Sequence, residues 1–163
     1  MEQFTGKVWI LGDDIDTDII MPTEYLALKT INDMCPYAFS PLRPELAEKI
    51  HAGDIIVAGK NFGCGSSREQ APIALHQLGV SLVMAKGFAR IFRRNSINIG
   101  LPVWVADMAD KLKTGDEVEV DLEKGTVTVN GEVNEFTPMA PTVLKTLEYG
   151  GLIPRVRAEL GIE

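Results

Sequence analysis

The sequence predicts an α/β fold with a mostly parallel sheet, crossover helices and a C-terminal β-meander. Between residues 55 and 105, short apolar runs alternate with helical patterns, which is typical of parallel strands joined by helices. From Lys113 onwards the pattern changes to short alternating segments around Asn130-Gly131, a strong hairpin signal. A chain of 163 residues can bury its own core, so we expect one domain over residues 1–163.

The expected elements follow in order along the chain. β-Forming residues from Phe4 to Leu11 predict the first strand, and Gly12 predicts the turn that ends it. The remaining strands are expected at 55–57, 81–85, 102–105, 117–121, 126–129 and 132–136. Helices are expected at 45–51, 66–78, 88–96, 141–149 and 153–160.

Composition excludes several function classes. The net charge of −7 argues against nucleic-acid binding and against anionic membrane surfaces, because both require clustered Lys and Arg. The N-terminal segment has no secretory pattern and no stretch approaches the length of a membrane span, so we expect a cytoplasmic location. Cys35 and Cys64 are too few to hold a metal or an iron–sulfur cluster, and we do not expect them to pair.

The stretch 57–70, VAGKNFGCGSSREQ, carries the candidate site. Glycines such as Gly63 and Gly65 let the backbone take positive φ and approach a ligand closely. Ser66 and Glu69 fit a capping box at the start of a helix, whose dipole would strengthen an anion site. Neither the Walker spacing nor the dinucleotide-binding spacing is met. The loop therefore predicts a small anionic ligand.

A second polar stretch, residues 13–18, packs four carboxylates into the sequence DDIDTD. The spacing does not fit an EF-hand, because the required Gly and the distal Glu are absent. From the residues alone, a solvated turn with Asx caps and a polar wall of a site both remain open.

The segment 61–69 resembles the serine loop of the aconitase superfamily. Residues 12–18, 85–92 and 95–102 resemble the small subunit, or swivelling domain, of the same family, in its isopropylmalate dehydratase and homoaconitase branch. The match runs in order from about residue 8 to residue 102. It implies an aconitase-like swivelling domain and a hydro-lyase of leucine biosynthesis. Such an enzyme isomerises a hydroxy-dicarboxylic acid by dehydration and rehydration.

The resemblance also implies roles for single residues. Ser66 would be the catalytic base, acting as an alkoxide, and the backbone at Gly63 and Gly65 would stabilise negative charge. The planar guanidinium of Arg68 suits a carboxylate, although a salt bridge to Glu69 or to an Asp of residues 13–18 is the alternative. The implied substrate-binding residues are Ser67, Arg68, Thr17 and Asp18.

The same resemblance places substrate selection in a loop formed by Tyr25, Leu26, Ala27, Leu28 and Lys29. Apolar side chains there would favour an alkyl group such as isopropyl, because burial of methylene groups is favourable. Lys29 could instead reach a third carboxylate. A homoaconitase or a dimethylmalate-type dehydratase therefore remains an alternative to isopropylmalate dehydratase.

The chain is expected to work with a partner. The resemblance implies an aconitase-like large subunit that carries a [4Fe–4S] cluster, with no metal or cofactor on this chain. Arg90, Arg93 and Arg94 form a basic cluster that is either a solvated helix face or a surface for an acidic partner. A function of a different class, a stand-alone module that binds carboxylate or phosphate, also remains open.

Overall fold

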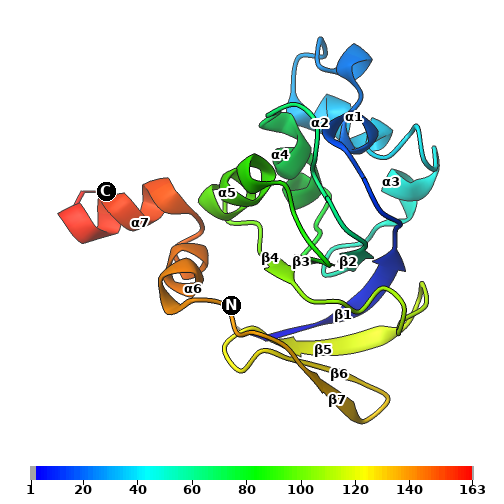
Figure 1. Ribbon diagram of the computed structural model, residues 1–163. Coiled ribbons are helices and arrows are strands. Elements are labelled where there is room, and N and C mark those ends of the chain that lie inside the picture. Colours follow the sequence, from blue (N-terminus) through cyan, green and yellow to red (C-terminus); the bar gives the residue numbers. More distant parts are fainter. Residues whose placement is uncertain (1–2, 163) are drawn as a thin grey trace.

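A seven-stranded mixed sheet forms the centre of the structure, a computed structural model that describes residues 3–162 (Figure 1). The strand order is β4-β3-β2-β1-β5-β6-β7, with parallel pairing from β4 to β1 and antiparallel pairing from β1 to β7. The strands are β1 (Gln3–Ile10), β2 (Ile55–Ala58), β3 (Leu82–Ala85), β4 (Val103–Val105), β5 (Glu117–Asp121), β6 (Thr126–Val129) and β7 (Glu132–Glu135).

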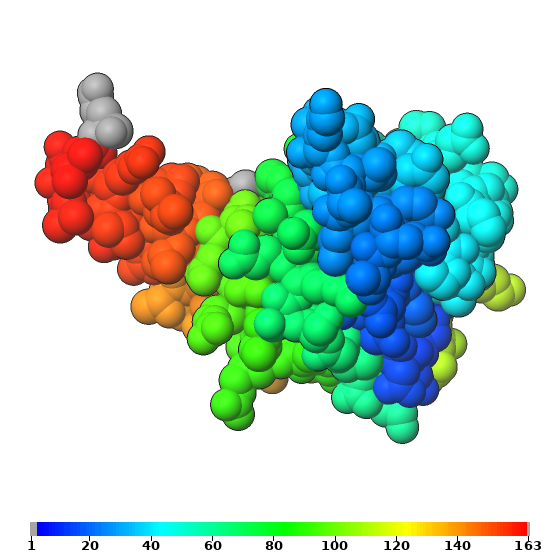
Figure 2. Space-filling view, turned by 90° about the horizontal axis from the view of Figure 1, so that it is seen from above, coloured from blue at the N-terminus to red at the C-terminus, as the bar shows by residue number. Residues whose placement is uncertain are grey.

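Helices α1 to α5 lie over one face of the parallel half, whereas α6 and α7, which come after the meander in the sequence, lie beside α5 (Figure 1 and Figure 2). The α-helices are α1 (Thr17–Ile20), α2 (Ile31–Met34), α3 (Leu46–Lys49), α4 (Gln70–Gln77), α5 (Arg90–Asn98), α6 (Pro141–Glu148) and α7 (Leu152–Leu160). Two short 3₁₀ helices are η1 (Thr23–Tyr25) and η2 (Cys35–Tyr37). None of the helices within the described residues has the length and apolar character needed to cross a membrane.

The central parallel strands β2 and β3 are buried on both faces, so each of them contributes to two cores. On β2, Ile56 faces the core beneath the helices and Ile55 faces the opposite core, because successive side chains point to opposite sides. The helix-side core also contains Leu75 of α4 and Phe92 of α5. Continuous apolar runs, rather than alternating ones, are therefore what these strands require.

The second core is closed by the antiparallel half of the sheet, which bends below the parallel half (Figure 1). Val118 and Val120 of β5 alternate with exposed glutamates, and both pack into this core. Leu144 and Leu147 of α6 cover its open side. Burial of each such side chain contributes about 1.5–3 kcal/mol. The meander thus completes the half-barrel, and the ends of β1 and β2 are left for the site loops.

The predicted α/β fold with a C-terminal meander is confirmed, and every predicted strand is present within a few residues of its expected bounds. Two helix expectations need correction. The helix expected from residue 66 begins only at Gln70, and the helix expected at 45–51 shrinks to the single turn Leu46–Lys49. The short helices between residues 17 and 37 were not predicted, because one turn of helix is too short to show periodicity.

Candidate functional site

Two loops meet where the parallel strands β1 and β2 end. The site loops, residues 12–17 and 59–65, continue the parallel pairing through four backbone hydrogen bonds that span the gap between them. The bonds are Gly59 N to Gly12 O (3.1 Å), Asp14 N to Lys60 O (2.8 Å), Gly63 N to Ile15 O (2.7 Å) and Thr17 N to Cys64 O (2.8 Å). The acidic stretch therefore forms a wall of the glycine loop, rather than an isolated solvated turn.

Side chains of the acidic stretch reinforce this pairing. The Lys60 amide donates to Asp13 Oδ1 at 2.9 Å, and Asn61 Nδ2 donates to Asp14 Oδ1 at 2.9 Å. Asp14 and Asn61 both have left-handed backbones, with φ of 56° and 59°. Asn and Asp tolerate that region better than other non-glycine residues. The two loops are held in a special conformation by contacts across 47 residues of sequence.

The glycines of the loop are required by their surroundings as well as by their torsions. Gly63 has φ of +81°, and a Cβ built on it would overlap the ring of Phe92. Gly65 has φ of +99°, and its Cβ would lie 3.2 Å from Thr17 Oγ1. A side chain at either position would push the loop away from its neighbours.

The backbone N–H groups of the loop do not all remain free. The Gly63 amide donates to the Ile15 carbonyl at 2.7 Å, so this amide already has an acceptor within the fold. The amides of Gly65, Ser66 and Ser67 have no hydrogen-bond acceptor among residues 3–162. Three successive unpaired donors of this kind are available to bind an anion.

Ser66 lies exposed at the rim, and its Oγ is 3.3 Å from Oγ1 of Thr17, which is only 2% exposed. The predicted capping box is wrong, since α4 starts at Gln70 and its N-cap, Glu69, makes no side-chain capping bond. A turn closed by Arg68 N and the Ser66 carbonyl, at 2.9 Å, delays the helix. The helix dipole falls off within the first turn, so it contributes little at Ser66.

Arg68 uses part of its guanidinium group for contacts with other residues of the chain. Its Nη1 donates to the Met21 carbonyl at 3.1 Å and forms an ion pair with Asp18, and Nη2 donates to Thr23 Oγ1 at 2.7 Å. The alternative salt bridge to an Asp of the acidic stretch is therefore present. A guanidinium has five N–H donors, and the Nε edge with the second Nη2 hydrogen has no partner among the described residues. That edge is a two-point donor for a carboxylate.

A pocket of about 370 Å³ opens beside these residues. Its walls include the predicted residues Thr17, Gly63, Gly65, Ser66, Ser67 and Arg68. Asp18 contributes only through its ion pair with Arg68. Arg90 and Asn95 of α5 also line the pocket and were not named as site residues from the sequence, although both lie in the 85–102 region that carries the resemblance.

None of the predicted selection residues 25–29 lines this pocket. Tyr25 stacks on Tyr37 with ring centroids 4.0 Å apart, and Ala27, Leu28 and Lys29 are exposed. Their nearest link to the site is Thr23, two residues before Tyr25, which accepts the hydrogen bond from Arg68. The selection loop therefore flanks the site in this chain.

The two cysteines have different environments. Burial raises the pKa of Cys35, whose Sγ lies 3.7 Å from the Ala74 carbonyl. The pKa of Cys64 is also raised, first by burial and then by the negative charges of Asp16 and Asp14. Both thiols are free, and within residues 3–162 no group of three or more His, Cys, Asp or Glu could hold a metal ion. The chain's own donors therefore do not suit an iron–sulfur cluster.

Comparison with known proteins links this geometry to a family. The sequence-family model of the aconitase C-terminal domain matches residues 41–107, which include the glycine loop. A 3-isopropylmalate dehydratase small subunit from Lachnospira eligens is 56% identical over 163 residues, covering 99% of both chains. A methanogen homoaconitase small subunit from Methanothermobacter thermautotrophicus is 48% identical over 151 residues, covering 91% of this chain and 87% of that protein.

A solved structure is similar over nearly the whole chain. The crystal structure of 3-isopropylmalate dehydratase from Methanocaldococcus jannaschii superposes with a TM-score of 0.91 at 38% sequence identity. The match covers 97% of this chain and 95% of that one. The similarity therefore includes the C-terminal meander and helices as well as the loops that form the pocket.

Proposed function

Since the chain belongs to the family of 3-isopropylmalate dehydratase small subunits, within the aconitase family, we propose that it is the small subunit of a two-chain hydro-lyase of leucine biosynthesis. The substrate is a hydroxy-dicarboxylic acid whose hydroxyl group moves to the neighbouring carbon. The observation that carries the proposal is the pocket in which the exposed Ser66 hydroxyl lies beside three free amides and the open edge of Arg68.

Ser66 is the base that removes the proton next to a substrate carboxylate. A serine hydroxyl keeps its proton at neutral pH, so an alkoxide needs several donors directed at it. The hydroxyl of Thr17, 3.3 Å from Ser66 Oγ, supplies one, and the unpaired amides of Gly65 and Ser67, on either side of Ser66 in the chain, are available to the alkoxide. Such preorganised donors contribute about 3–4 kcal/mol each in a site closed from water. A partner chain that covers the pocket would exclude the water.

Arg68 binds a substrate carboxylate through its open edge, and Asp18 fixes the guanidinium from the opposite side. The contacts to Asp18, Met21 and Thr23 restrict the rotation of the guanidinium, so less entropy is lost when substrate binds. In this proposal Asp18 is a positioning residue, and Ser67 and Thr17 contribute hydroxyl groups to the pocket.

The departing hydroxide requires a Lewis acid, which a [4Fe–4S] cluster on the large subunit would supply. This chain offers only one thiol near the pocket, Cys64, because Cys35 is buried against α4. An aconitase-like large subunit is therefore the proposed partner, and it closes the pocket from the side of Ser66.

The selection loop, residues 25–29, would extend over the variable group of the substrate in the assembled enzyme. Ala27 and Leu28 favour an alkyl group such as isopropyl, since each buried methylene contributes about 0.8 kcal/mol. Lys29 favours a third carboxylate, which is the homoaconitase alternative, and the 48% identity to a homoaconitase small subunit supports keeping that alternative.

The central test is Ser66→Ala in complex with the large subunit. We expect turnover to fall by about three orders of magnitude or more, because the base is removed. Association and thermal stability should hardly change, since the hydroxyl contacts only Thr17 and caps no helix. Ser40→Ala is the matched control, a serine whose hydroxyl makes no hydrogen bond among the described residues.

Two outcomes would reject the proposal. Near-normal turnover in Ser66→Ala would remove the serine from the chemistry. A chain that binds malate-type acids alone, and gains no iron-dependent activity with any large subunit, would instead be a stand-alone carboxylate-binding module.

Substrate choice is tested by comparing kcat/KM for isopropylmalate and homocitrate in the reconstituted enzyme. We expect isopropylmalate to be preferred, and Ala27→Arg to shift the ratio toward homocitrate by about tenfold, because a guanidinium pairs with the third carboxylate. Ala158→Arg, on the exposed helix α7, is the control for added charge. A preference for homocitrate in the unaltered enzyme would make Lys29 the selecting residue.

A further inference from the structure

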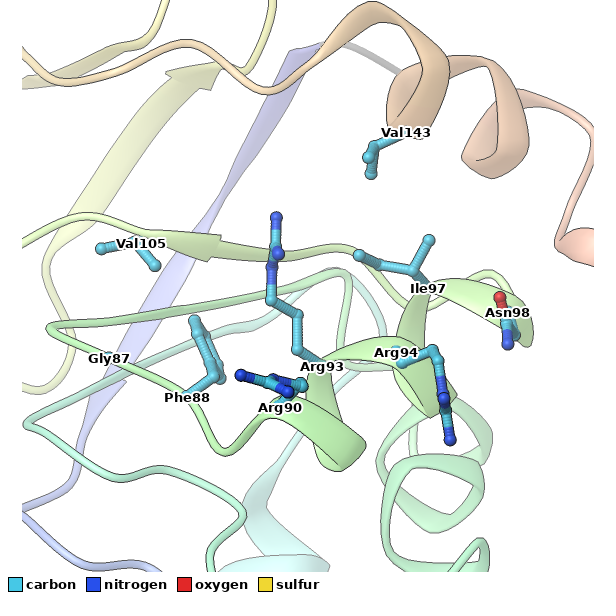
Figure 3. Close-up of a pocket in the computed structure, with 9 residues that line it drawn as sticks. All are labelled: Gly87, Phe88, Arg90, Arg93, Arg94, Ile97, Asn98, Val105 and Val143. Carbon is cyan, nitrogen blue, oxygen red and sulfur yellow. The ribbon is translucent and has the colours of Figure 1, made fainter.

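A second hollow lies directly beside the Ser66 pocket. This arginine groove, of about 580 Å³, runs between α5, β4 and α6 (Figure 3). Arg90, Arg93 and Arg94 of α5 line it together with apolar side chains that include Val105 and Val143. Arg90 lines both hollows, so the groove and the Ser66 pocket adjoin at this residue.

The three arginines of the groove have no partner inside the chain. None of them makes an ion pair or a side-chain hydrogen bond with residues 3–162, and all three are exposed. By contrast, Arg68 and Arg155 are each paired with a carboxylate. No Asp or Glu lines the groove, although the chain as a whole carries a net charge of −7. A concentrated positive surface on an acidic chain would attract an acidic partner over distances of about a Debye length.

The arrangement of the side chains favours an extended partner segment over a small anion. In Figure 3, Arg93 reaches across the groove between Val105 and Ile97, Arg90 lies beside Phe88, and Arg94 points away from both. A single phosphate or carboxylate would need guanidinium groups that converge on one point. Separated cations instead match carboxylates spaced along a chain.

Exposed apolar side chains accompany these charges. Val105 on β4 is 49% exposed and Ile91 on α5, at the edge of the Ser66 pocket, is 45% exposed. Protein interfaces are enriched in arginine next to apolar side chains, whereas a purely solvated helix face has no need of the latter. The groove has this mixed character.

We propose that the arginine groove docks an acidic segment of the cluster-bearing large subunit, one with several spaced carboxylates and at least one apolar side chain. This inference rests on the proposed function, because that function requires the partner to cover Ser66. A chain that covers Ser66 reaches Arg90, and from there the groove leads it along α5 to α6. Docking here would orient the swivelling domain so that the Ser66 pocket faces the partner.

The test measures the affinity of this chain for its large subunit at low and high salt. The Arg93→Glu/Arg94→Glu double variant leaves out Arg90, which also lines the substrate pocket. We expect it to weaken association about tenfold to a hundredfold at low salt, with a smaller difference at high salt. Arg93→Lys/Arg94→Lys should restore most of the affinity. Turnover at saturating large subunit should stay within about threefold, because neither arginine lines the Ser66 pocket.

The matched control is Arg43→Glu. Arg43 is also exposed and unpaired, but it precedes α3, which lies on the far side of the helical layer from α5 in Figure 1. Equal loss of affinity in this control would reduce the effect to net charge and overturn the docking site. Unchanged affinity in the double variant would overturn it directly.

The remaining outcomes also separate the two proposals. Normal affinity with lost turnover at saturation would assign the groove to the substrate path. Binding of inorganic phosphate to the free chain that is lost in the double variant, with association unchanged, would make it a small-anion site. If Ser66→Ala associates normally but is inactive while the double variant associates as well as wild type, only the docking proposal fails. If the wild-type chain does not associate with any large subunit, both the proposed function and the docking proposal are wrong.

Discussion

Residues with positive φ occur in both the site loops and the β-meander, but different forces hold them there. In the meander, Asn130 and Gly131 have φ of 51° and 80° and form the two-residue connection between β6 and β7. The Asn-Gly pair favours such a turn by itself, without contacts from elsewhere in the fold. In the site loops, Asp14 and Asn61 take nearly the same φ, but they bond to each other across the fold.

The conformation of the meander turn is therefore stabilised by its local sequence, whereas that of the site loops is stabilised by long-range contacts. We therefore expect a substitution in the turn to affect only its own torsions and to leave the pairing of β6 and β7 in place. A substitution in the loops affects a wall of the pocket, because both loops share backbone hydrogen bonds with each other. Substitutions at positions with the same φ can thus have different effects on function.

For the comparison of these two regions, the largest expected effect comes from a pair of alanine substitutions at matched glycines, Gly63→Ala and Gly131→Ala. Their φ values are +81° and +80°, so the torsional strain is the same, about 1–2 kcal/mol. Gly131 has open space around it, whereas a Cβ at Gly63 overlaps Phe92 and adds about 1–3 kcal/mol of overpacking. We expect turnover to fall about a hundredfold or more in Gly63→Ala alone, because the loop beside Ser66 is displaced.

Urea unfolding and turnover in the reconstituted complex measure the two effects. Equal loss of stability in both variants, with normal turnover in both, would contradict the claim that the site loops depend on long-range packing and the meander turn does not. In that case the ring of Phe92 yields without moving the loop.

A smaller effect is expected from replacing the two left-handed asparagines by glycine, which keeps their torsions accessible. Asn130→Gly should be nearly neutral, because its side chain makes no hydrogen bond among the described residues. Asn61→Gly removes the bond to Asp14, and we expect turnover to fall about tenfold with less than about 1 kcal/mol of lost stability, since the pair is exposed. Turnover and thermal unfolding of both variants provide the measurement. Equal turnover in the two variants would show that the backbone bonds suffice to hold the loops.

The same contrast explains which features the sequence could predict. The Asn130-Gly131 hairpin and the parallel strands were predicted, because turn chemistry and apolar runs are local signals. The capping box at Ser66 and Glu69 satisfied its local rule and was still wrong, because the turn at Arg68 and the hydroxyl of Thr17 determine where Ser66 lies.

Long-range contacts could not be predicted from one sequence. The bonds from Arg68 to Met21 and Thr23 join segments 47 and 45 residues apart, and neither acceptor belongs to a motif. Asn95 and Arg90 reach the pocket only because α5 crosses beside the glycine loop. The loop itself was predicted as an anion site from its glycine pattern, and its residue roles were predicted by resemblance. The structure shows which of its backbone donors remain free.

The smallest expected effect is a shift in thiol reactivity at Cys64, which reports whether the site loops stay paired in solution. Burial and the charges of Asp16 and Asp14 raise the pKa of this thiol. The reactive form is the thiolate, and a raised pKa means that less thiolate is present at any pH below it. Alkylation by iodoacetamide should therefore reach half its maximal rate at a higher pH in the folded chain than in the urea-unfolded chain.

Asp14→Asn separates the charge effect from burial, because it removes one negative charge and keeps an oxygen that can accept from Asn61. We expect the half-maximal pH of Cys64 alkylation to move toward that of an ordinary thiol, and added salt to move the wild-type value in the same direction. Cys35 serves as the internal control, since it is 7% exposed and should stay unmodified until the chain unfolds. The position of the pH profile, followed by mass spectrometry of the two cysteine peptides, is more informative than the absolute rate, because limited access lowers the rate at every pH. If the folded and unfolded profiles coincide at Cys64, the acidic stretch does not stay beside the glycine loop, and the long-range pairing that distinguishes this region from the meander would be lost in solution.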